Sequence, residues 1–491
     1  MEKDVADPGT RGGLWARLRS CPGTSLVVGV IAVNFVLGLL TNQLLFRDFA
    51  NSGDEYSYQI SSWLFAEGKL SVPSPEPRDF FEFNHVVNDG RFYGKYPPGW
   101  PALLTPGVLL GVPWIVNLIL SAATLAACYA VAKRHFSDEV AAIAMLIALG
   151  NPFIVFNSAS YFSHTACLLF VTLFLGGALD WLRDPSSKRA PLLMGACAGA
   201  AFLIRPYSAV VLMGTAGAVL AARSVKAGTV KSLGPCLVAF AIPALGFLAL
   251  HFLYNRFLTG SALQLPFTKY DTSDKPSWPT LAELPHRLKI HGALRLLQLS
   301  VWLPLAPVLA ILYALMPRIR SRFPGALLAL FPAGLFAAYF LYRGTGTNQY
   351  GPRYLFEGVT ALLILAACVI QGFPRRRAVL LSAVVLVNAA AFVGYGHYHV
   401  QQIRDRMLPY DLVERQGVRN AIVFLRTGSG TMEDEDLTRN GIHFNGPVLY
   451  VVDKGPRNED LRKRYPDRQA FYFEYNESTR TGRLTPWPSR G

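Results

Sequence analysis

The chain has few charged residues for its length. Only 16% of its 491 residues are Asp, Glu, Lys or Arg, whereas 52% are hydrophobic. Soluble domains carry roughly 25% charged residues, so this composition argues against a soluble enzyme and favours a polytopic membrane protein. Several apolar runs reach about 20 residues, the length needed to cross a hydrocarbon core of roughly 30 Å.

Cysteine is also scarce, and none of the six cysteines falls in a predicted outer loop. All lie in apolar segments or just before the first one: Cys21, Cys128, Cys167, Cys197, Cys236 and Cys368. This distribution argues against a disulfide framework, and the spacings do not match a metal site.

We expect no cleavable signal peptide, and no internal repeat is evident. Residues 1–20 are of mixed charge, and the first apolar run, 26–46, is too long for the hydrophobic region of a signal peptide. We therefore interpret this run as a retained signal anchor. Many transporters consist of repeats, and this sequence shows none of that kind.

The net charge of +15 is distributed in short Lys and Arg clusters between apolar runs. This pattern disfavours nucleic acid as a partner and indicates membrane orientation, because basic loops stay cytoplasmic. With about eleven spans, every cluster lies on one side. That count requires two short spans within 191–222, turning at Arg205-Pro206. Gly195 and Gly199 have the small-xxx-small spacing that allows close helix packing.

These segments divide the chain into three parts. We expect a cytoplasmic N-terminus at 1–25, a transmembrane domain at 26–396 with its first outer loop at 47–100, and an extracytoplasmic soluble tail at 397–491. The predicted fold is an all-α polytopic membrane protein with interfacial helices, one of them at 99–111, and a small C-terminal α/β domain. The tail pattern predicts a helix near Asn458–Arg464 and strands near Ala421–Leu425, Val448–Val452 and Ala470–Phe473.

An acidic pair, Asp54 and Glu55, lies in the first outer loop. Ser52 and Glu55 have the spacing of a capping box for a helix that follows. Capping does not involve Asp54. A charged carboxylate at the outer end of apolar membrane segments therefore requires another explanation. We therefore expect Asp54 to act in chemistry at the outer membrane face.

Three short motifs resemble the GT-C glycosyltransferases. They are Gly53-Asp54-Glu55, then Tyr96-Pro97-Pro98-Gly99-Trp100-Pro101, and finally the segment 349–357 before a late span. The chain is most similar to the protein O-mannosyltransferase-like family (family 39), which includes the aminoarabinose transferases that modify lipid A. The resemblance covers roughly residues 26–396, and the order and outer-face placement of the motifs are its most specific features.

The resemblance implies a GT-C fold and an inverting glycosyltransferase in the inner (plasma) membrane. Its donor would be a sugar linked to polyprenyl phosphate, and its acceptor a lipid such as lipid A, a surface glycan or a protein at the extracytoplasmic face. Such a site needs a carboxylate that takes the acceptor proton and cations that stabilise the leaving phosphate. We assign the first role to Asp54, with Glu55 as a helper.

Arg205, Arg353 and Lys95 are the predicted phosphate-binding residues. Both arginines lie at predicted outer ends of spans, where a lipid phosphate would sit, and arginine binds phosphate through two N–H groups. The alternative is that these arginines snorkel at the membrane boundary.

Other substrate-binding candidates are Tyr96, His164, Tyr350, Tyr354 and Glu357. Tyr96 could instead have a structural role in a rigid turn. Glu357 lies one helical turn after Arg353 and could instead form a structural ion pair with that arginine.

No cofactor is certain, and a divalent metal stays open. The only metal ligands that the sequence offers are Asp54, Glu55 and His164. Many members of the family carry another acidic residue near the turn where His164 lies, and its absence here puts a metal site in doubt. His397 and His399 are expected at the surface.

Two other functions compete with sugar transfer. A transporter or flippase of lipid-linked sugars would carry polar residues at the bilayer midplane and broken helices. A glycan ligase or polymerase is the third alternative. The notable charged residues collect at the outer ends of spans, and the acidic pair comes early in the chain, so we favour the transferase.

Overall fold

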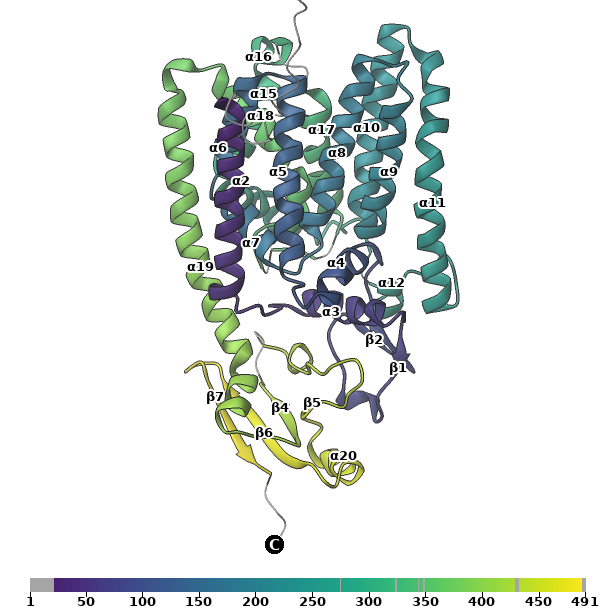
Figure 1. The fold of residues 1–491 in the computed structure, drawn as a ribbon, viewed down its shortest axis with the longest axis vertical. Coiled ribbons are helices and arrows are strands. Elements are labelled where there is room, and N and C mark those ends of the chain that lie inside the picture. Colours follow the sequence, from purple (N-terminus) through teal and green to yellow (C-terminus); the bar gives the residue numbers. More distant parts are fainter. Residues whose placement is uncertain are drawn as a thin grey trace, which may run out of the picture.

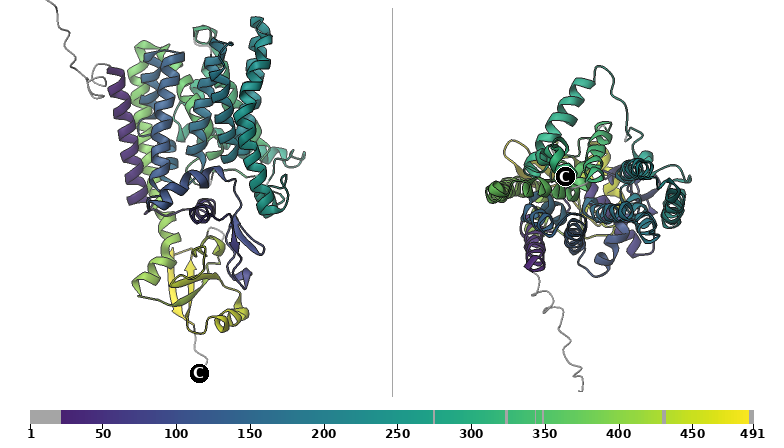
Figure 2. Two further views of the ribbon diagram at one scale, coloured as in Figure 1. Left: turned by 45° about the vertical axis from the view of Figure 1, so that its right-hand side comes forward. Right: turned by 90° about the horizontal axis from the view of Figure 1, so that it is seen from above.

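The computed structural model describes residues 22–273, 275–322, 325–342, 344–347, 349–428 and 432–487. A bundle of long helices forms one part of the molecule, and a small mixed sheet lies beyond one end of it (Figure 1). Between them lies the first outer loop, whose short helices and strands contact both parts. Figure 2 shows the bundle helices running side by side, as expected for a polytopic membrane protein.

Seven apolar helical segments are long enough to cross a membrane, and two bent pairs raise the number to nine. The seven comprise α2 (Pro22–Leu40), α5 (Ile115–His135), α8 (His164–Arg183), α10 (Pro206–Ala227), α11 (Leu233–Thr259), α18 (Val359–Gln371) and α19 (Arg377–Arg415). Two shorter apolar helices, α9 (Arg189–Ile204) and α17 (Ala326–Phe340), lie among them. Together these elements match the eleven predicted segments in order.

Two helix pairs are sharply bent, and the first bend has a local cause. Helices α6 (Asp138–Ala148) and α7 (Pro152–Ala159) meet at 66°. Gly150 has φ +61° there, and the Asn151 side chain caps α7 by accepting a hydrogen bond from the Ile154 N–H. The second pair bends by 109° before α15 (Ala306–Leu315), after α13 (Leu284–Arg287), a π-helical turn (Leu288–Leu294) and α14 (Arg295–Trp302).

The predicted division of 191–222 into two helices is confirmed. Helix α9 ends at Ile204, Arg205 forms the junction, and α10 begins at Pro206. Gly195 and Gly199 lie against α11, because a Cβ on either glycine would overlap with Phe240 or Phe247.

The first outer loop forms a small layer under the bundle. It contains α3 (Gly53–Ala66), α4 (Gly99–Leu109) and a sheet of order β1-β3-β2 built from Val72–Pro73, Arg91–Gly94 and Val86–Asn88. Helix α4 is too short to span a membrane and lies beneath the bundle, as expected for the interfacial piece predicted at 99–111 (Figure 1). A short helix, α12 (Pro266–Tyr270), lies beside this layer.

The tail is a four-stranded sheet of order β5-β4-β6-β7. Strands β4 (Ala421–Arg426), β5 (Val448–Val452) and β6 (Gln469–Asn476) are parallel, and α20 spans Asn458–Arg464, as predicted. The fourth strand, β7 (Thr481–Pro486), pairs antiparallel with β6 and was not predicted, because its Thr, Gly and Arg residues lack the apolar pattern of the other strands.

Helix α19 connects the bundle to the tail without a break. The predicted boundary at 396/397 lies inside this helix, which continues to Arg415. The surface prediction is therefore wrong for His399, which is 1% exposed and packs between Phe46 and Tyr350. His397 is exposed, because it lies on the opposite face of the same helix.

Two of the predicted basic clusters lie at the end of the bundle away from the tail, whereas the cluster before residue 22 lies outside the described residues. The α10–α11 and α18–α19 connections, which carry Lys226, Lys231 and Arg375 to Arg377, both lie there (Figure 1). This segregation agrees with the predicted topology. That the tail end is extracytoplasmic stays a prediction.

Candidate active site

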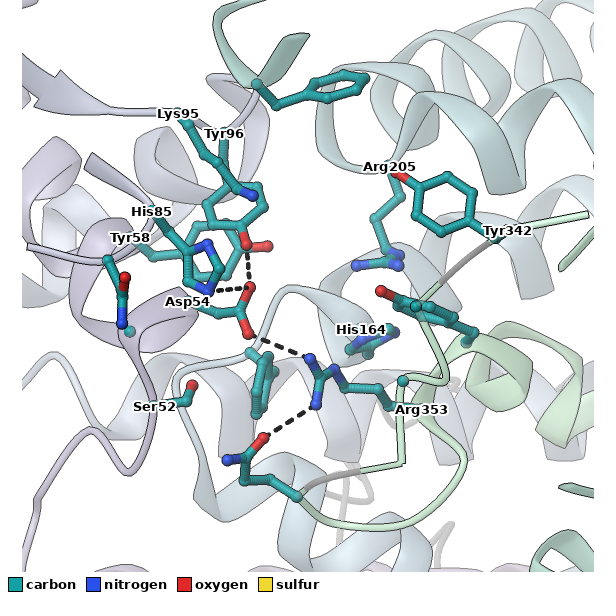
Figure 3. A pocket seen from close by; sticks show the side chains of 18 of the residues that line it. Ser52, Asp54, Tyr58, His85, Lys95, Tyr96, His164, Arg205, Tyr342 and Arg353 are labelled. Atoms are coloured by element: carbon teal, nitrogen blue, oxygen red, sulfur yellow. Dashed lines mark hydrogen bonds and ion pairs between the residues drawn. The ribbon is translucent and has the colours of Figure 1, made fainter. Parts of the chain in front are cut away.

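A cavity of about 520 Å³ lies at the tail end of the bundle (Figure 3). The first outer loop, the start of α8, the α9–α10 junction, the segment between α17 and α18, and the tail all contribute to its walls. It thus joins segments from nearly the whole length of the chain.

Asp54 projects into this cavity from the first turn of α3. Its Oδ2 lies 3.1 Å from Nη2 of Arg353, and its Oδ1 accepts a hydrogen bond from the Tyr96 hydroxyl. The Nε2 of His85 lies 3.8 Å from Oδ1. The side chain is 17% exposed, so the carboxylate is held in a largely dry site but still opens to the cavity.

The charges around Asp54 keep it ionised. Burial alone would raise its pKa, but the positive field of His85, Arg353 and Lys95 outweighs that effect and holds the pKa of Asp54 well below its usual range. Burial lowers the pKa of His85, so we attribute the stabilisation at neutral pH chiefly to the arginine and the lysine.

Glu55 points away from the cavity. Its Oε1 accepts a hydrogen bond from the Tyr161 N–H at 2.9 Å, and its backbone N–H donates to Ser52 Oγ at 3.3 Å, which is the predicted capping interaction. Burial raises the pKa of Glu55 to about 7. The residue positions α3 and thereby Asp54, whereas its role as a catalytic helper stays a prediction.

Arg353 lies across the cavity from α3, and contacts on several sides hold its guanidinium in place. Besides Asp54, its guanidinium donates to Gln349 Oε1 at 3.1 Å and lies 4.5 Å from the ring of Phe162. A phosphate that entered the cavity would meet a cation already fixed in position.

Arg205 lies at the α9–α10 junction and forms a second buried ion pair. Its Nε lies 3.0 Å from Oε1 of Glu357, which also contacts Nδ1 of His164 at 2.9 Å. The expected partnership of Glu357 with Arg353 is therefore wrong. Residues 353–358 form a 3₁₀ helix, in which positions four apart do not align as they do in an α-helix.

Three more of the predicted residues have clear positions. Lys95 lines the cavity, with its Nζ 5.4 Å from the ring of Tyr96, and Tyr354 lines it with its ring stacked on Tyr339 at 4.7 Å. Tyr350 is fully buried against Phe46 and does not line the cavity, and neither do Glu55 and Glu357.

Two residues of the first outer loop line the cavity although the sequence did not single them out. Tyr58 follows Asp54 by one helical turn, and its hydroxyl contacts Ser163 Oγ at 3.0 Å. His85 has φ +67° and faces Asp54. The helical spacing from Asp54 was a usable signal for Tyr58, whereas His85 had only its place between the acidic and Pro-Pro motifs.

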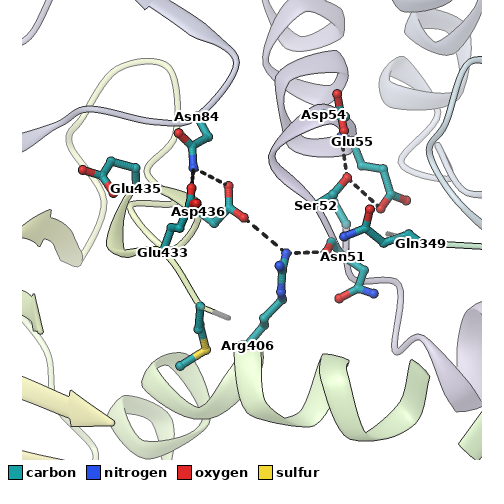
Figure 4. A network of polar contacts seen from close by, with 12 residues as sticks. Asn51, Ser52, Asp54, Glu55, Asn84, Gln349, Arg406, Glu433, Glu435 and Asp436 are labelled. Carbon is teal, nitrogen blue, oxygen red and sulfur yellow. Dashed lines mark hydrogen bonds and ion pairs between the residues drawn. The ribbon is translucent and has the colours of Figure 1, made fainter. Parts of the chain in front are cut away.

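The tail supplies a further wall that the sequence did not reveal (Figure 4). Glu433 and Asp436 line the cavity together with Arg406 of α19. Asn84 donates to Asp436 Oδ1 at 3.0 Å, and Nη1 of Arg406 lies 3.4 Å from Asp436 Oδ2. These contacts join the tail to the first outer loop at the edge of the cavity.

The predicted metal ligands do not form a common site. Glu55 bonds to Ser52 and Tyr161 and does not line the cavity. Asp54 and His164 both line it, but His164 bonds to Glu357 and Asp54 pairs with Arg353. Within the described ranges, no group of three or more His, Cys, Asp or Glu side chains is arranged to hold a metal ion. We therefore derive no step through a metal.

The fold of this chain is similar to that of a solved membrane protein, ArnT, and a family model matches part of the chain. Residues 108–251 match the model of the family described as dolichyl-phosphate-mannose-protein mannosyltransferase. This match and the structural likeness to ArnT confirm the resemblance that the motifs predicted. No curated protein matches the chain.

Among solved structures, ArnT from Cupriavidus metallidurans bound to undecaprenyl phosphate is similar over 93% of this chain and 94% of its own, with a TM-score of 0.57 and 14% identity. Its apo state gives the same values. A weaker likeness, with a TM-score of 0.45 and 10% identity, links 93% of this chain to 70% of the oligosaccharyltransferase AglB from Archaeoglobus fulgidus, in complex with an inhibitory peptide and a dolichol-phosphate.

Proposed function

We propose that the protein transfers a sugar from a polyprenyl-phosphate donor to an acceptor at the extracytoplasmic membrane face, with inversion at the anomeric carbon. The observation that carries the proposal is the meeting of Asp54 with Arg353 at 3.1 Å in a cavity that Arg205 and Lys95 also line. One sugar phosphate bound there would place its phosphate among three cations and its sugar next to a carboxylate. The undecaprenyl phosphate in the ArnT structure supports this class of donor.

The reaction assigns a separate task to each side of the cavity. The bond between the anomeric carbon and the phosphate oxygen breaks, and its electron pair stays on the phosphate, where Arg205, Arg353 and Lys95 stabilise the charge. The acceptor hydroxyl bonds to the opposite face of that carbon and gives its proton to Asp54. Because the phosphate competes with Asp54 for Arg353, donor binding would also raise the basicity of that carboxylate.

Flipping of a lipid-linked sugar is the second candidate, because the bundle contains the bent helix pairs that such a transporter would use. At the α6–α7 bend, Asn151 donates to Asn388 Oδ1 at 2.9 Å, which places buried amides within the bundle. These amides pair with one another and with backbone carbonyls, as a structural bend requires.

The test is transfer by the purified protein, supplied with a panel of polyprenyl-phosphate sugars and membrane extracts, with products identified by mass spectrometry. Asp54→Asn keeps the side-chain shape but loses the base, so turnover should fall by about 10²-fold or more while donor binding persists. Asp89→Asn is the matched control, because Asp89 lies in the same loop outside the cavity and pairs with Lys269.

Undiminished turnover by Asp54→Asn would remove that residue from the chemistry. If wild-type protein formed no product but moved the donors across proteoliposomes, the flippase would replace the transferase.

A further inference from the structure

A second cavity, of about 440 Å³, lies at the end of the bundle away from the tail. The C-terminal ends of α5, α8 and α10 and the first turn of α17 surround it. Nothing in the transfer reaction uses this cavity, and it shares no lining residue with the first one.

Three cations line the second cavity: Arg183, Arg223 and Lys226. Among the residues that the structure describes, none of the three forms an ion pair with a carboxylate. The nearby Asp180 does not line the cavity, because it pairs with Arg134 at 2.7 Å and with His135 at 3.2 Å. The cavity therefore has an uncompensated positive charge.

Two buried polar side chains in the same wall have no partner among the described residues. They are the Trp181 indole N–H, 1% exposed, and the Ser224 hydroxyl, 2% exposed. An unpaired buried donor destabilises a protein by about 1–3 kcal/mol, so native structures contain few of them.

Several equivalent groups elsewhere in the bundle are paired, although the Thr41 and Thr165 hydroxyls are not. Trp100 donates its indole N–H to the Tyr161 carbonyl at 2.7 Å. Thr172 and Thr215 donate to the carbonyls of residues four positions earlier, as helical hydroxyls commonly do. The Ser224 hydroxyl has no such bond among the described residues, and Ser224 lines the cavity.

The first turn of α17 adds backbone donors to this wall. Ala326 and Leu327 line the cavity and occupy the first two positions of the 15-residue helix. The N–H groups of a first helical turn have no partner within the helix and attract anions. They strengthen a site that the cations and the two side-chain donors already define.

The remaining lining side chains are mostly apolar, among them Phe136, Leu179, Leu182 and Val219. A cavity whose lining combines cations and hydrogen-bond donors with apolar side chains fits an amphipathic anion. Basic pockets between transmembrane helices bind lipid phosphate groups in this manner.

We propose that this second cavity binds a phosphate group, carried either by an anionic lipid or by a small soluble phosphate. Arg183, Arg223 and Lys226 supply the charge, and Trp181 and Ser224 donate directed hydrogen bonds. The proposal does not depend on the transfer reaction at the other end of the bundle.

The experiment measures binding of two probes to the full-length, delipidated protein. One probe is phosphatidylglycerol, titrated in native mass spectrometry against phosphatidylcholine as the neutral comparison. The other is inorganic phosphate, followed by calorimetry. We expect one tightly retained anionic lipid, or one phosphate ion, per chain. Retention of the lipid alone identifies a headgroup site, whereas binding of both identifies a general phosphate site.

Matched variants separate a built site from general positive charge. Arg223→Gln with Lys226→Gln should weaken binding about tenfold or more, because two charge-assisted contacts are lost. Lys188→Gln with Lys231→Gln removes the same charge at the same end outside the cavity and should leave binding unchanged. Trp181→Phe and Ser224→Ala should each weaken binding several-fold at unchanged net charge.

Wild-type affinity in Trp181→Phe and Ser224→Ala, or equal loss in both double variants, would overturn the proposal, as would the absence of binding to either probe. Thermal unfolding of each variant establishes that a loss of binding is not a loss of fold. If no donor supports sugar transfer while these binding differences persist, the proposed function is wrong, but the proposal of a phosphate site in the second cavity still holds.

Discussion

The two walls of the cavity at the tail end of the bundle differ in net charge. The wall formed by the membrane domain and first outer loop presents three cations and Asp54, whereas the tail wall presents two carboxylates and Arg406. The three cations are Lys95, Arg205 and Arg353, and the two carboxylates are Glu433 and Asp436. If the cavity binds a sugar phosphate as proposed, this difference in charge favours the orientation in which the phosphate faces the first wall. The tail wall is then left for the acceptor, and the proposed base, Asp54, lies between the two.

The largest expected effect comes from removing Arg353, which breaks the positive wall. Arg353→Ala loses the two-point phosphate contact and leaves Asp54 without its partner, so donor affinity should fall about 10²-fold or more, and acceptor affinity far less. Arg353→Lys should recover part of the lost donor affinity, because lysine keeps the positive charge but cannot make the two-point contact of the guanidinium. The measurement is donor binding by calorimetry together with separate Michaelis constants for donor and acceptor.

Arg457→Gln is the control for this change. Arg457 belongs to the tail, pairs with Asp79 outside the cavity and is exposed, so its loss should hardly alter donor binding. Unchanged donor affinity in Arg353→Ala would assign that arginine to the structure of the wall alone.

A smaller effect is expected from the opposite wall. Asp436→Asn removes the carboxylate that holds Arg406 and accepts from Asn84, which should loosen the tail edge of the cavity. We expect the Michaelis constant for the acceptor to rise about tenfold while donor affinity stays near wild type. Asp411→Asn serves as the control, because Asp411 pairs with Arg47 away from the cavity. Equal losses for donor and acceptor would show that the walls do not divide the substrates between them.

The sequence predicted the first wall far better than the second. Hydropathy and helix caps are local, so the eleven apolar segments, the turn at Arg205-Pro206 and the capping by Ser52 could all be found without coordinates. Asp54, Arg205 and Arg353 were found because polar residues at the ends of apolar runs are conspicuous. The error over Glu357 arose because a 3₁₀ turn replaced the expected α-helix.

The second wall depends on how the tail packs, and no local pattern encodes that. Phe80 and Phe81 of the first outer loop pack into the apolar face of the tail sheet with Ile422, Phe424 and Leu449. This contact, between segments more than 300 residues apart, brings the loop with Glu433 and Asp436 to the cavity. Predicting it would have required the register of both sheets and the direction in which α19 leaves the bundle.

The smallest effect on transfer is expected from a change at Glu55, which lies behind the wall that carries the cations. A variant of this residue distinguishes a role in positioning Asp54 from a role in the reaction itself. Its pKa of about 7 lies above the ordinary 4.5, because burial favours the protonated carboxyl. The folded state therefore binds this proton more tightly than the unfolded state. The resulting stability is present in acid and is lost as the pH rises from about 4.5 through about 7.

Glu55→Gln should remove that dependence, because the amide keeps an acceptor for the Tyr161 N–H but cannot ionise. We compare the free energies of unfolding of variant and wild type at pH 5 and pH 8. Relative to wild type, the free energy of unfolding of the variant should rise by on the order of 3 kcal/mol from pH 5 to pH 8. Glu76→Gln, at an exposed position, is the control, and its free energy of unfolding should depend on pH in the same way as that of wild type. Transfer activity in Glu55→Gln should change only a few-fold, since Asp54 keeps its contacts with Arg353 and Tyr96. A loss as deep as that of Asp54→Asn, with no change in the pH dependence of unfolding, would place Glu55 in the chemistry instead and would make the wall a two-carboxylate site.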